Sequence, residues 1–333
     1  MRDRYAIILA AGKGARMESN NPKAAKVSFP VLGKALINYS IDAVKPLVKQ
    51  IFVVVGYGAE SIIPLIGDQA TIVEQKEILG TGHAVMQVLP YIKDKDIDVV
   101  ILNGDTPLLT TETLEKVIHK YEKNQNKLTI CTTVLEKPQG YGRVVRERPS
   151  YRIKSVVPNA ELTEEEAADI NEINSGIYIV DNKLLQHYLP KLSKDNKKNE
   201  YYLSDIVKLF TDDSHLVEAY VLEDAADIFN INDRIQLAYA AKVMRKRVNQ
   251  KLMLSGVSIE DPDTAYISPE VIIGKDTVIG PNTHIIGKCV IGENNFIGPN
   301  AGLYNVKMGN NNVVVGRYLE NVTIKDNEKI MVK

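Results

Sequence analysis

The chain has 333 residues, enough for about two ordinary domains, which excludes a mini-protein. Its 41 basic and 42 acidic residues leave a formal net charge of -1, so no overall basic field attracts nucleic acid or an anionic membrane, and any anion site must be local. No apolar run approaches the roughly 20 residues of a membrane span, and no signal peptide is evident. The two cysteines lie far apart in sequence and give no disulfide framework, so we expect a cytoplasmic protein.

Short aliphatic segments rich in Val and Ile alternate with amphipathic stretches from residue 5 to about residue 230. This alternation predicts an α/β domain over residues 1–231, with strands joined by crossover helices in a mainly parallel sheet. The predicted strands are residues 5–9, 51–55, 71–73, 98–102, 128–134 and 177–180. Because ligands bind such sheets at the carboxyl ends of strands, the residues just after each strand are the first functional candidates.

The first predicted strand leads directly into a glycine-containing turn, LAAGKGARM at residues 9–17, followed by Pro22-Lys23. A dinucleotide-binding fingerprint would need a third glycine near position 17, and no GxxxxGK[ST] P-loop occurs here. What remains is a turn whose backbone N–H groups can approach an anion, flanked by the cations Arg16 and Lys23. This combination suits a triphosphate, although a lone glycine turn after a strand is often only structural.

Two polar residues are candidate Mg²⁺ ligands. Asp105 follows the strand at residues 98–102, which places a carboxylate at a strand's carboxyl end. Mg²⁺ in nucleotide sites often takes one or two protein oxygens and completes its octahedron with phosphate and water. Asn232 is the candidate for a second oxygen, and its alternative role is to cap the helix that follows.

Two further segments carry groups that suit a nucleotide sugar. In QKEILGTGHA, residues 75–84, the Gln75 amide can donate to and accept from a base edge, and a flat ring can lie against the Gly80-Thr81 turn. In QGYGR, residues 139–143, two glycines expose backbone groups suited to sugar hydroxyls. His83 has no nucleophile near it in sequence, so we expect a structural role for it.

The last hundred residues predict a helix and then a repeat. Residues 232–256 contain no Gly or Pro before Gly256, which predicts one connecting helix that ends there. A hexapeptide period follows and predicts a parallel β-helix over residues 257–333, with about three coils between 265 and 318 and a pattern that degrades at 310–312. Its aliphatic positions are Ile267, Ile273, Ile279, Ile285, Ile291, Ile297 and Leu303. Repeats alone carry no chemistry, so assembly is the simplest role.

Nine segments, taken in order, resemble the uridylyltransferase half of the bacterial family of bifunctional N-acetylglucosamine-1-phosphate uridylyltransferase/glucosamine-1-phosphate acetyltransferase. They are LAAGKGARM, PK, QKEILGTGHAV, GDTPL, QGYGRVVR, EINSGIY, NEYYLSDIV, NINDRIQLA and LMLSGVSIEDP, and the resemblance extends to about residue 300. It implies a Rossmann-like nucleotide-diphospho-sugar transferase domain, the long helix and a left-handed β-helix that forms homotrimers. The implied reaction is Mg²⁺-dependent transfer of a uridylyl group from UTP to a sugar-1-phosphate, most simply N-acetylglucosamine-1-phosphate.

The resemblance also implies roles for the residues that match its motifs. Arg16 and Lys23 would be catalytic cations on the phosphates, and Asp105 and Asn232 would hold Mg²⁺. The implied nucleotide-binding residues are Leu9, Ala10, Ala11, Gly12, Gln75, Gly80 and Thr81. The implied sugar-binding residues are Gly140, Gly142 and Asn174.

The sequence departs from this family in three places. Pro158 stands where relatives carry a sugar-contacting Glu, so another sugar-1-phosphate is an alternative substrate, and Asn103 replaces an aromatic residue before the implied metal ligand. The chain also ends before the coils that hold the family's acetyltransferase site, so we expect no acetyltransferase activity. Two other functions stay open, namely acyl transfer through the hexapeptide repeats and a non-catalytic subunit that senses nucleotide sugars.

Overall fold

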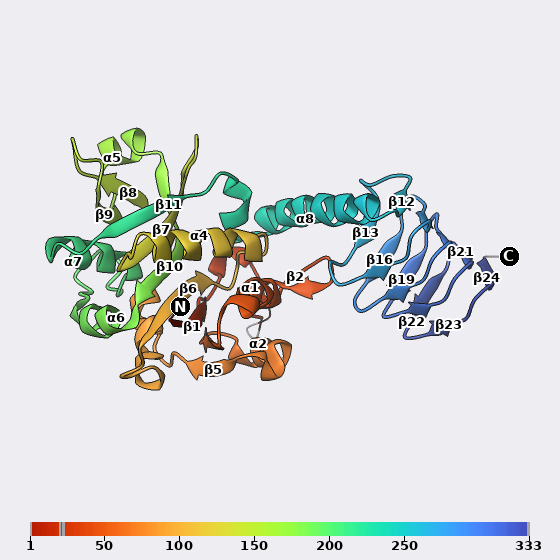
Figure 1. Ribbon diagram of the computed structural model, residues 1–333, viewed down its shortest axis with the longest axis horizontal. Coiled ribbons are helices and arrows are strands. Elements are labelled where there is room, and N and C mark those ends of the chain that lie inside the picture. Colours follow the sequence, from red (N-terminus) through yellow and green to blue (C-terminus); the bar gives the residue numbers. More distant parts are fainter. Residues whose placement is uncertain (1, 20, 22–23, 332–333) are drawn as a thin grey trace. The chain divides into compact units, whose positions relative to one another are not determined.

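The computed structural model describes residues 2–19, 21 and 24–331, which fall into two compact units (Figure 1). Residues up to Phe29 and Leu36–Asp233 form the first unit, and Pro30–Ala35 with Arg234–Lys333 form the second. The sequence did not predict that the short hairpin of β2 (Pro30–Val31) and β3 (Lys34–Ala35) would belong to the second unit. No helix in the described ranges combines the length and apolar character that a membrane crossing requires.

The first unit is built on a mixed sheet with the central strand order β11-β7-β10-β6-β1-β4-β5. Its strands are β1 (Asp3–Ala10), β4 (Gln50–Val55), β5 (Thr71–Glu74), β6 (Ile97–Asn103), β7 (Leu128–Val134), β10 (Glu172–Asp181) and β11 (Val217–Val221). Neighbours β6, β1, β4 and β5 are parallel, as are β7 and β11, whereas β10 runs antiparallel to β6 and β7. The six predicted strands are therefore present, and the mainly parallel α/β fold class is confirmed.

Helices accompany these strands, as the alternating pattern predicted. They are α1 (Leu36–Val44), α2 (Ala59–Ile66), α3 (Thr81–Met86), α4 (Thr111–Lys123), α5 (Glu164–Asp169), α6 (Asn182–Tyr188) and α7 (Ile206–Asp212). Strand β6 is buried at every position except its last, Asn103, because both faces of the sheet are covered. The hairpin of β8 (Arg143–Arg146) and β9 (Ile153–Val157), which joins β10, was not predicted, since these short strands interleave polar with apolar residues.

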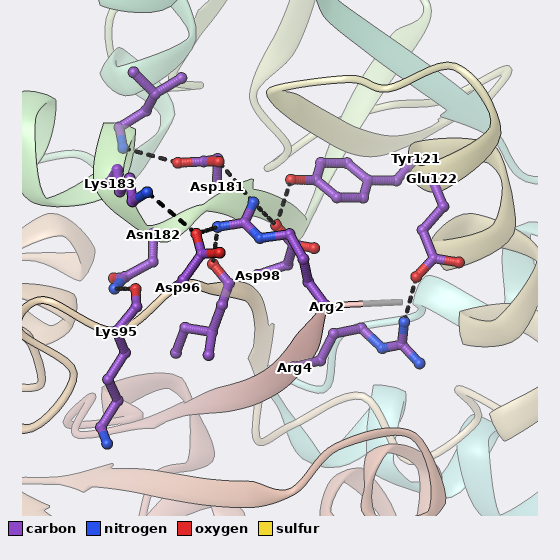
Figure 2. Close-up of polar contacts among 12 residues, drawn as sticks. Arg2, Arg4, Lys95, Asp96, Asp98, Tyr121, Glu122, Asp181, Asn182 and Lys183 are labelled. Carbon is purple, nitrogen blue, oxygen red and sulfur yellow. Dashed lines mark hydrogen bonds and ion pairs between the residues drawn. The ribbon is translucent and has the colours of Figure 1, made fainter.

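A cluster of charged residues lies at the end of the sheet where β1 and β6 begin (Figure 2). Asp98 and Asp181 lie directly opposite each other in the β6–β10 ladder, a pairing that is unfavourable for two like charges. The Arg2 Nη1 atom donates to both carboxylates, at 2.9 Å to Asp98 and 2.7 Å to Asp181. Tyr121 donates a further hydrogen bond to Asp98 at 2.9 Å, and burial raises the pKa of Asp98. The cluster thus joins antiparallel β10 to the parallel part of the sheet.

The long helix α8 (Arg234–Leu254) lies within the predicted range of 232–256, and Gly256 terminates it two residues after its last helical residue. Gly256 has φ 99°, its N–H donates to the Met253 carbonyl at 3.1 Å, and the Val257 N–H donates to the Leu252 carbonyl at 3.2 Å. These two bonds form the Schellman arrangement, which satisfies carbonyls that the helix end leaves without partners. A glycine suits the position because a side chain there would be strained.

After α8 the chain winds into three parallel sheets, the arrangement of the predicted left-handed β-helix. The sheets have the strand orders β12-β15-β18-β21-β24, β13-β16-β19-β22 and β14-β17-β20-β23. The strands are β12 (Ser258–Ile259), β13 (Tyr266–Ile267), β14 (Ile272–Ile273), β15 (Val278–Ile279), β16 (His284–Ile286), β17 (Val290–Ile291), β18 (Phe296–Ile297), β19 (Gly302–Tyr304), β20 (Lys307–Met308), β21 (Val313–Val315), β22 (Tyr318–Glu320), β23 (Thr323–Ile324) and β24 (Lys329–Met331). All seven predicted hexapeptide positions are buried and belong to its core.

The hexapeptide pattern degrades at residues 310–312 as predicted, yet the coils do not end there and continue through β24. The period shortens instead: Ile285 pairs with Leu303, 18 residues later, but Leu303 pairs with Leu319, only 16 residues later. Asn311, with φ 59°, stacks on the corner residue Asn294, whose Nδ2 donates to the Asn311 Oδ1 at 3.1 Å. Asparagine tolerates this left-handed conformation, so the Asn-rich segment forms a corner of the β-helix.

Candidate functional site

A cavity of about 880 Å³ lies in the first unit beside the carboxyl ends of β1, β5 and β6. Strands β6, β1, β4 and β5 are parallel neighbours, so the residues that follow them meet at one edge of the sheet. The predicted site residues that line the cavity are Leu9, Ala10, Ala11, Gly12, Gln75, Gly80, Thr81 and Asp105. The fold therefore brings together every residue predicted for nucleotide binding and one of the two predicted metal ligands.

The glycine turn after β1 leaves its backbone open. A Cβ atom added to Gly12 would meet no atom within 4 Å, so a ligand can approach this peptide closely. Gly14 has φ 58°, and a Cβ there would lie 2.6 Å from the Cβ of Lys26. Gly14 thus provides both the left-handed conformation and the space beside which the Lys26 side chain runs.

Lys26 contacts both predicted metal ligands, Asp105 and Asn232, and we name this group of three residues the metal corner. Its ammonium group forms an ion pair with the Asp105 carboxylate and lies 3.1 Å from the Asn232 Oδ1 atom. The side chains of Lys26 and Asp105 are only 14% and 11% exposed, so water screens this pair weakly. Sequence reasoning missed Lys26, because no motif or spacing distinguishes it from Lys23, which lies outside the described residues.

The donor set of this corner fits a divalent cation. Oxygens from Asp105 and Asn232 converge on one positive group, and the buried Asp105 Oδ1 atom has no hydrogen-bond partner among the described residues. Within those residues, no three His, Cys, Asp or Glu side chains form a cluster that could hold a metal. One carboxylate and one amide oxygen are too few to enclose Mg²⁺, so phosphate and water oxygens would complete its coordination shell.

The residues predicted to bind sugar gather beside the cavity and do not line it. The Asn174 N–H donates to the Gly142 carbonyl at 2.9 Å, and the Asn174 Nδ2 donates to the Tyr178 hydroxyl at 2.6 Å. The Gly140 N–H donates to the Asn159 Oδ1 at 3.1 Å. Asn103 connects the two regions, since it lines the cavity and its Nδ2 lies 3.5 Å from the Ser175 carbonyl.

Tyr141, between the two predicted sugar-binding glycines, lies close to the metal corner. Burial raises the pKa of Tyr141, and the negative charge of Asp105 raises it further. The Ile231 N–H donates to the Asp105 carbonyl at 3.1 Å, which holds the segment before Asn232 against the strand that supplies the carboxylate. Arg16, in contrast, is exposed and does not line the cavity.

The cavity is also lined by a turn around Gly80, which has φ 100°. A Cβ on Gly80 would lie 2.6 Å from the Tyr201 carbonyl oxygen, so only glycine fits. The Tyr201 backbone donates to the Leu79 carbonyl at 2.8 Å and accepts from the Gly82 N–H at 2.8 Å. The Leu203 N–H donates to the Thr81 Oγ1 at 3.0 Å, and together these bonds fix the turn against residues 201–203.

Comparison with known proteins agrees with this geometry. Residues 5–242 match the family model described as nucleotidyl transferase, and residues 270–305 match the bacterial transferase hexapeptide model of six repeats. The chain belongs to the nucleotidyl transferase family. Its relatives confirm the resemblance found in the nine segments: it is 43% identical over 289 residues to "Bifunctional protein GlmU" of Geobacillus sp. (strain WCH70).

Further relatives give the same result. The chain is 42% identical over 287 residues to a protein of that name from Exiguobacterium sp. (strain ATCC BAA-1283 / AT1b), and 40% identical over 289 residues to one from Listeria monocytogenes serotype 4a (strain HCC23). Each match covers 86% of this chain and 62% of the relative. The chain therefore spans less than two thirds of the length of these curated relatives.

Lys198, Glu200 and Tyr202 complete a wall of the cavity that the sequence did not assign. Just behind it, η7 (Leu203–Asp205) carries a carboxylate in an unfavourable setting. Burial, and then the charge of Glu161, raise the pKa of Asp205 from 3.8 to about 6. The folded chain therefore holds this proton to a higher pH than the unfolded chain does.

We predict that Asp205→Asn changes the pH dependence of stability. The contribution of protonated Asp205 is fully present below about pH 4 and is lost as the pH rises through about 6, because ionisation of the buried group then destabilises the fold. The melting temperature of Asp205→Asn relative to the wild type should therefore rise between about pH 4 and pH 7, as measured by calorimetry. The exposed neighbour Asp195, changed to Asn, serves as control. A difference that stays constant or falls with pH would contradict the assignment.

Proposed function

We propose that this chain transfers a uridylyl group from UTP to a sugar-1-phosphate and releases pyrophosphate, with N-acetylglucosamine-1-phosphate as the first sugar to test. The observation that carries the proposal is that one cavity is lined both by Lys26 and Asp105, with Asn232 in contact with Lys26, and by the Gln75–Gly80 turn. Membership of the nucleotidyl transferase family and relatives named bifunctional GlmU support it.

The proposed chemistry is an in-line displacement at the α-phosphorus of the nucleotide. An oxygen of the sugar phosphate forms the new bond, and the bond to the β-phosphate oxygen breaks, so the electron pair leaves with pyrophosphate. A phosphate oxygen is already a nucleophile, so no general base is needed. The protein must hold two anions together and in line, which requires positive charge and precise positioning.

Different residues of the cavity have different roles in the proposed reaction. Mg²⁺, which Asp105 and Asn232 would hold with phosphate oxygens, would offset charge on the phosphates. Lys26 brings a second positive charge to the same corner. It is our candidate for the cation that neutralises the negative charge developing on the leaving group. Gly12 allows the phosphates to approach the backbone, and Arg16 and Lys23 stay candidates for further phosphate contacts.

The sugar would lie beside Asn103, toward Gly140, Gly142 and Asn174. Pro158, where the resembling family carries a sugar-contacting Glu, offers no side-chain hydrogen bond, and its carbonyl accepts from the Glu161 N–H at 2.9 Å. Since one unpaired polar contact can change specificity strongly, a different sugar-1-phosphate is part of the proposal's test.

We further propose that the chain assembles as a homotrimer through its β-helix. Ile272 and Val290, adjacent in register on β14 and β17, are 62% and 48% exposed and present an apolar outer face. Exposed apolar side chains that lie side by side are candidates for an interface. A cytoplasmic location follows as a proposal from the use of a nucleoside triphosphate as substrate.

The function is tested by measuring pyrophosphate release over a grid of nucleoside triphosphates and sugar-1-phosphates. We expect release with UTP and one or more sugar-1-phosphates, loss of release when EDTA removes divalent metal, and recovery when Mg²⁺ is restored. No release with any pair would overturn the proposal, and nucleotide-sugar binding without turnover would favour a sensing subunit. In parallel, acetyl-CoA with glucosamine-1-phosphate should release no thiol; release would support the acyltransferase alternative.

The metal corner is tested by substitution. Asp105→Asn should lower kcat by on the order of 10²-fold, because metal stabilisation of transition-state charge is a several-kcal/mol effect. Lys26→Met should also lower kcat strongly, whereas Lys13→Met, which changes an exposed lysine of the same cavity, should have a smaller effect. Near-wild-type turnover of Asp105→Asn would remove Asp105 from the metal site, and equal effects at both lysines would argue against a special role for Lys26.

The assembly is tested by analytical ultracentrifugation. The wild type should sediment with three times the monomer mass, and Ile272→Asp should shift it toward the monomer because a charge in an apolar interface is costly. Ile235→Asp is the control, since Ile235 is 83% exposed on α8. A monomeric wild type would refute the trimer, and a trimer unaffected by Ile272→Asp would exclude this face.

A further inference from the structure

His83 contacts the residue best placed to recognise a base. Gln75 is 2% exposed and lines the cavity beside the Gly80 turn. Its Nε2 atom lies 3.0 Å from the Gly80 carbonyl oxygen and 3.0 Å from His83 Nδ1. Both hydrogens of the amide nitrogen therefore have partners within the protein. The Gln75 Oε1 atom accepts no hydrogen bond from a described residue and is not enclosed, so it is the polar atom left for a ligand in the cavity.

The chemistry of the neighbours determines which way this amide points. A carbonyl oxygen can only accept, so the Gln75 atom next to the Gly80 carbonyl must be the nitrogen. The same nitrogen faces His83 Nδ1, which must then be an acceptor without a proton. A neutral imidazole has one donor and one acceptor nitrogen, and the proton of His83 therefore belongs on Nε2.

A second side-chain amide, that of Gln87, also contacts the His83 ring. Each amide presents its nitrogen to a different ring nitrogen, and each would need that ring nitrogen to be the acceptor. Its Nε2 atom lies 3.1 Å from His83 Nε2 and 3.0 Å from the His83 carbonyl oxygen. The ring cannot accept from both amides, so one of them must move. An exchange of the Gln87 oxygen and nitrogen would place the oxygen against the His83 carbonyl, which can only accept, so Gln87 cannot simply turn over in place. Gln87 is half-buried and can move its whole amide from the ring toward water, whereas Gln75 is 2% exposed and cannot, so the conflict is resolved at Gln87 and the Gln75 contact stays intact.

The His83 ring is itself held in place. It lies in α3, two residues after Thr81, and stacks on the Tyr201 ring with 6.1 Å between ring centroids and 26° between planes. Tyr201 also fixes the Gly80 turn through its backbone. The ring, the turn and the Gln75 amide therefore form one rigid set of contacts, which is what an unambiguous hydrogen-bonding edge requires.

We propose that His83 is a positioning residue for base selection: by accepting from Gln75 at Nδ1, it fixes the Gln75 amide with only its oxygen toward the base. An acceptor favours a pyrimidine edge that carries an N–H, as uracil does at N3, and opposes cytosine, whose N3 is also an acceptor. This inference rests on the proposed nucleotidyl transfer and gives His83 a role beyond the structural one expected from sequence.

The first test compares UTP with CTP as substrates. His83→Phe keeps a ring against Tyr201 but removes the acceptor, so the ratio of kcat/KM for UTP to that for CTP should fall about tenfold, the worth of one hydrogen bond between neutral groups. His83→Asn can place an oxygen near the Nδ1 position and should recover most of the ratio. Gln87→Leu should leave the ratio unchanged, and KM for the sugar-1-phosphate should be similar in all variants. An unchanged ratio in His83→Phe would overturn the proposal.

The second test does not depend on turnover. The wild-type chain, with ¹⁵N in its histidine rings, should give His83 chemical shifts of an unprotonated Nδ1 and a protonated Nε2. The chain has five histidines, and His83 is assigned by the signal missing in His83→Asn. A protonated Nδ1 would refute the inference. Absence of all pyrophosphate release would instead refute the proposed function, so the two failures are distinguishable.

Discussion

A carboxylate buried just after a strand is stabilised by a positive partner, and the proposed site depends on this interaction at Asp105. The partner here is Lys26, whose stem passes beside Gly14 and whose ammonium group also contacts Asn232. The three side chains come from distant parts of the chain, and the parallel strands β1 and β6 bring two of them to one edge. Metal and phosphate would enter a corner where positive charge is already favoured.

The turn around Gly80, where we propose that the base binds, depends on a different interaction. It depends on backbone geometry, because the positive φ of Gly80 and its close approach to Tyr201 leave no space for a side chain. Hydrogen bonds then extend the order outward from this turn to Gln75 and His83. A charged corner and a neutral turn that line one cavity are the basis of our proposal that the cavity takes the phosphates and the base of a nucleotide.

The hexapeptide pattern predicted the core of the β-helix but not the extent of its coils. Seven aliphatic positions at a spacing of six were enough to predict its core, since each coil repeats the same inward-facing position. The later coils lose residues at their corners, so the period breaks while the stacking continues, as in the pairing of Leu303 with Leu319. A corner residue in the left-handed conformation, such as Asn311, resembles a loop in sequence and is a regular element in space.

Local patterns in the residues were sufficient for the six main strands, the helix terminator Gly256 and the hexapeptide core of the β-helix, because each depends on spacing along the chain. Much of the cavity lining was predicted from segments that resemble a known family, but Lys26, Lys198, Glu200 and Tyr202 were not. Only the tertiary structure decided three features: the contacts of Lys26 with Asp105 and Asn232, the β8–β9 hairpin and the hydrogen bonds of His83. They join residues separated along the chain by distances that carry no periodic signal, and burial, which makes such contacts strong, arises only when the strands and helices pack.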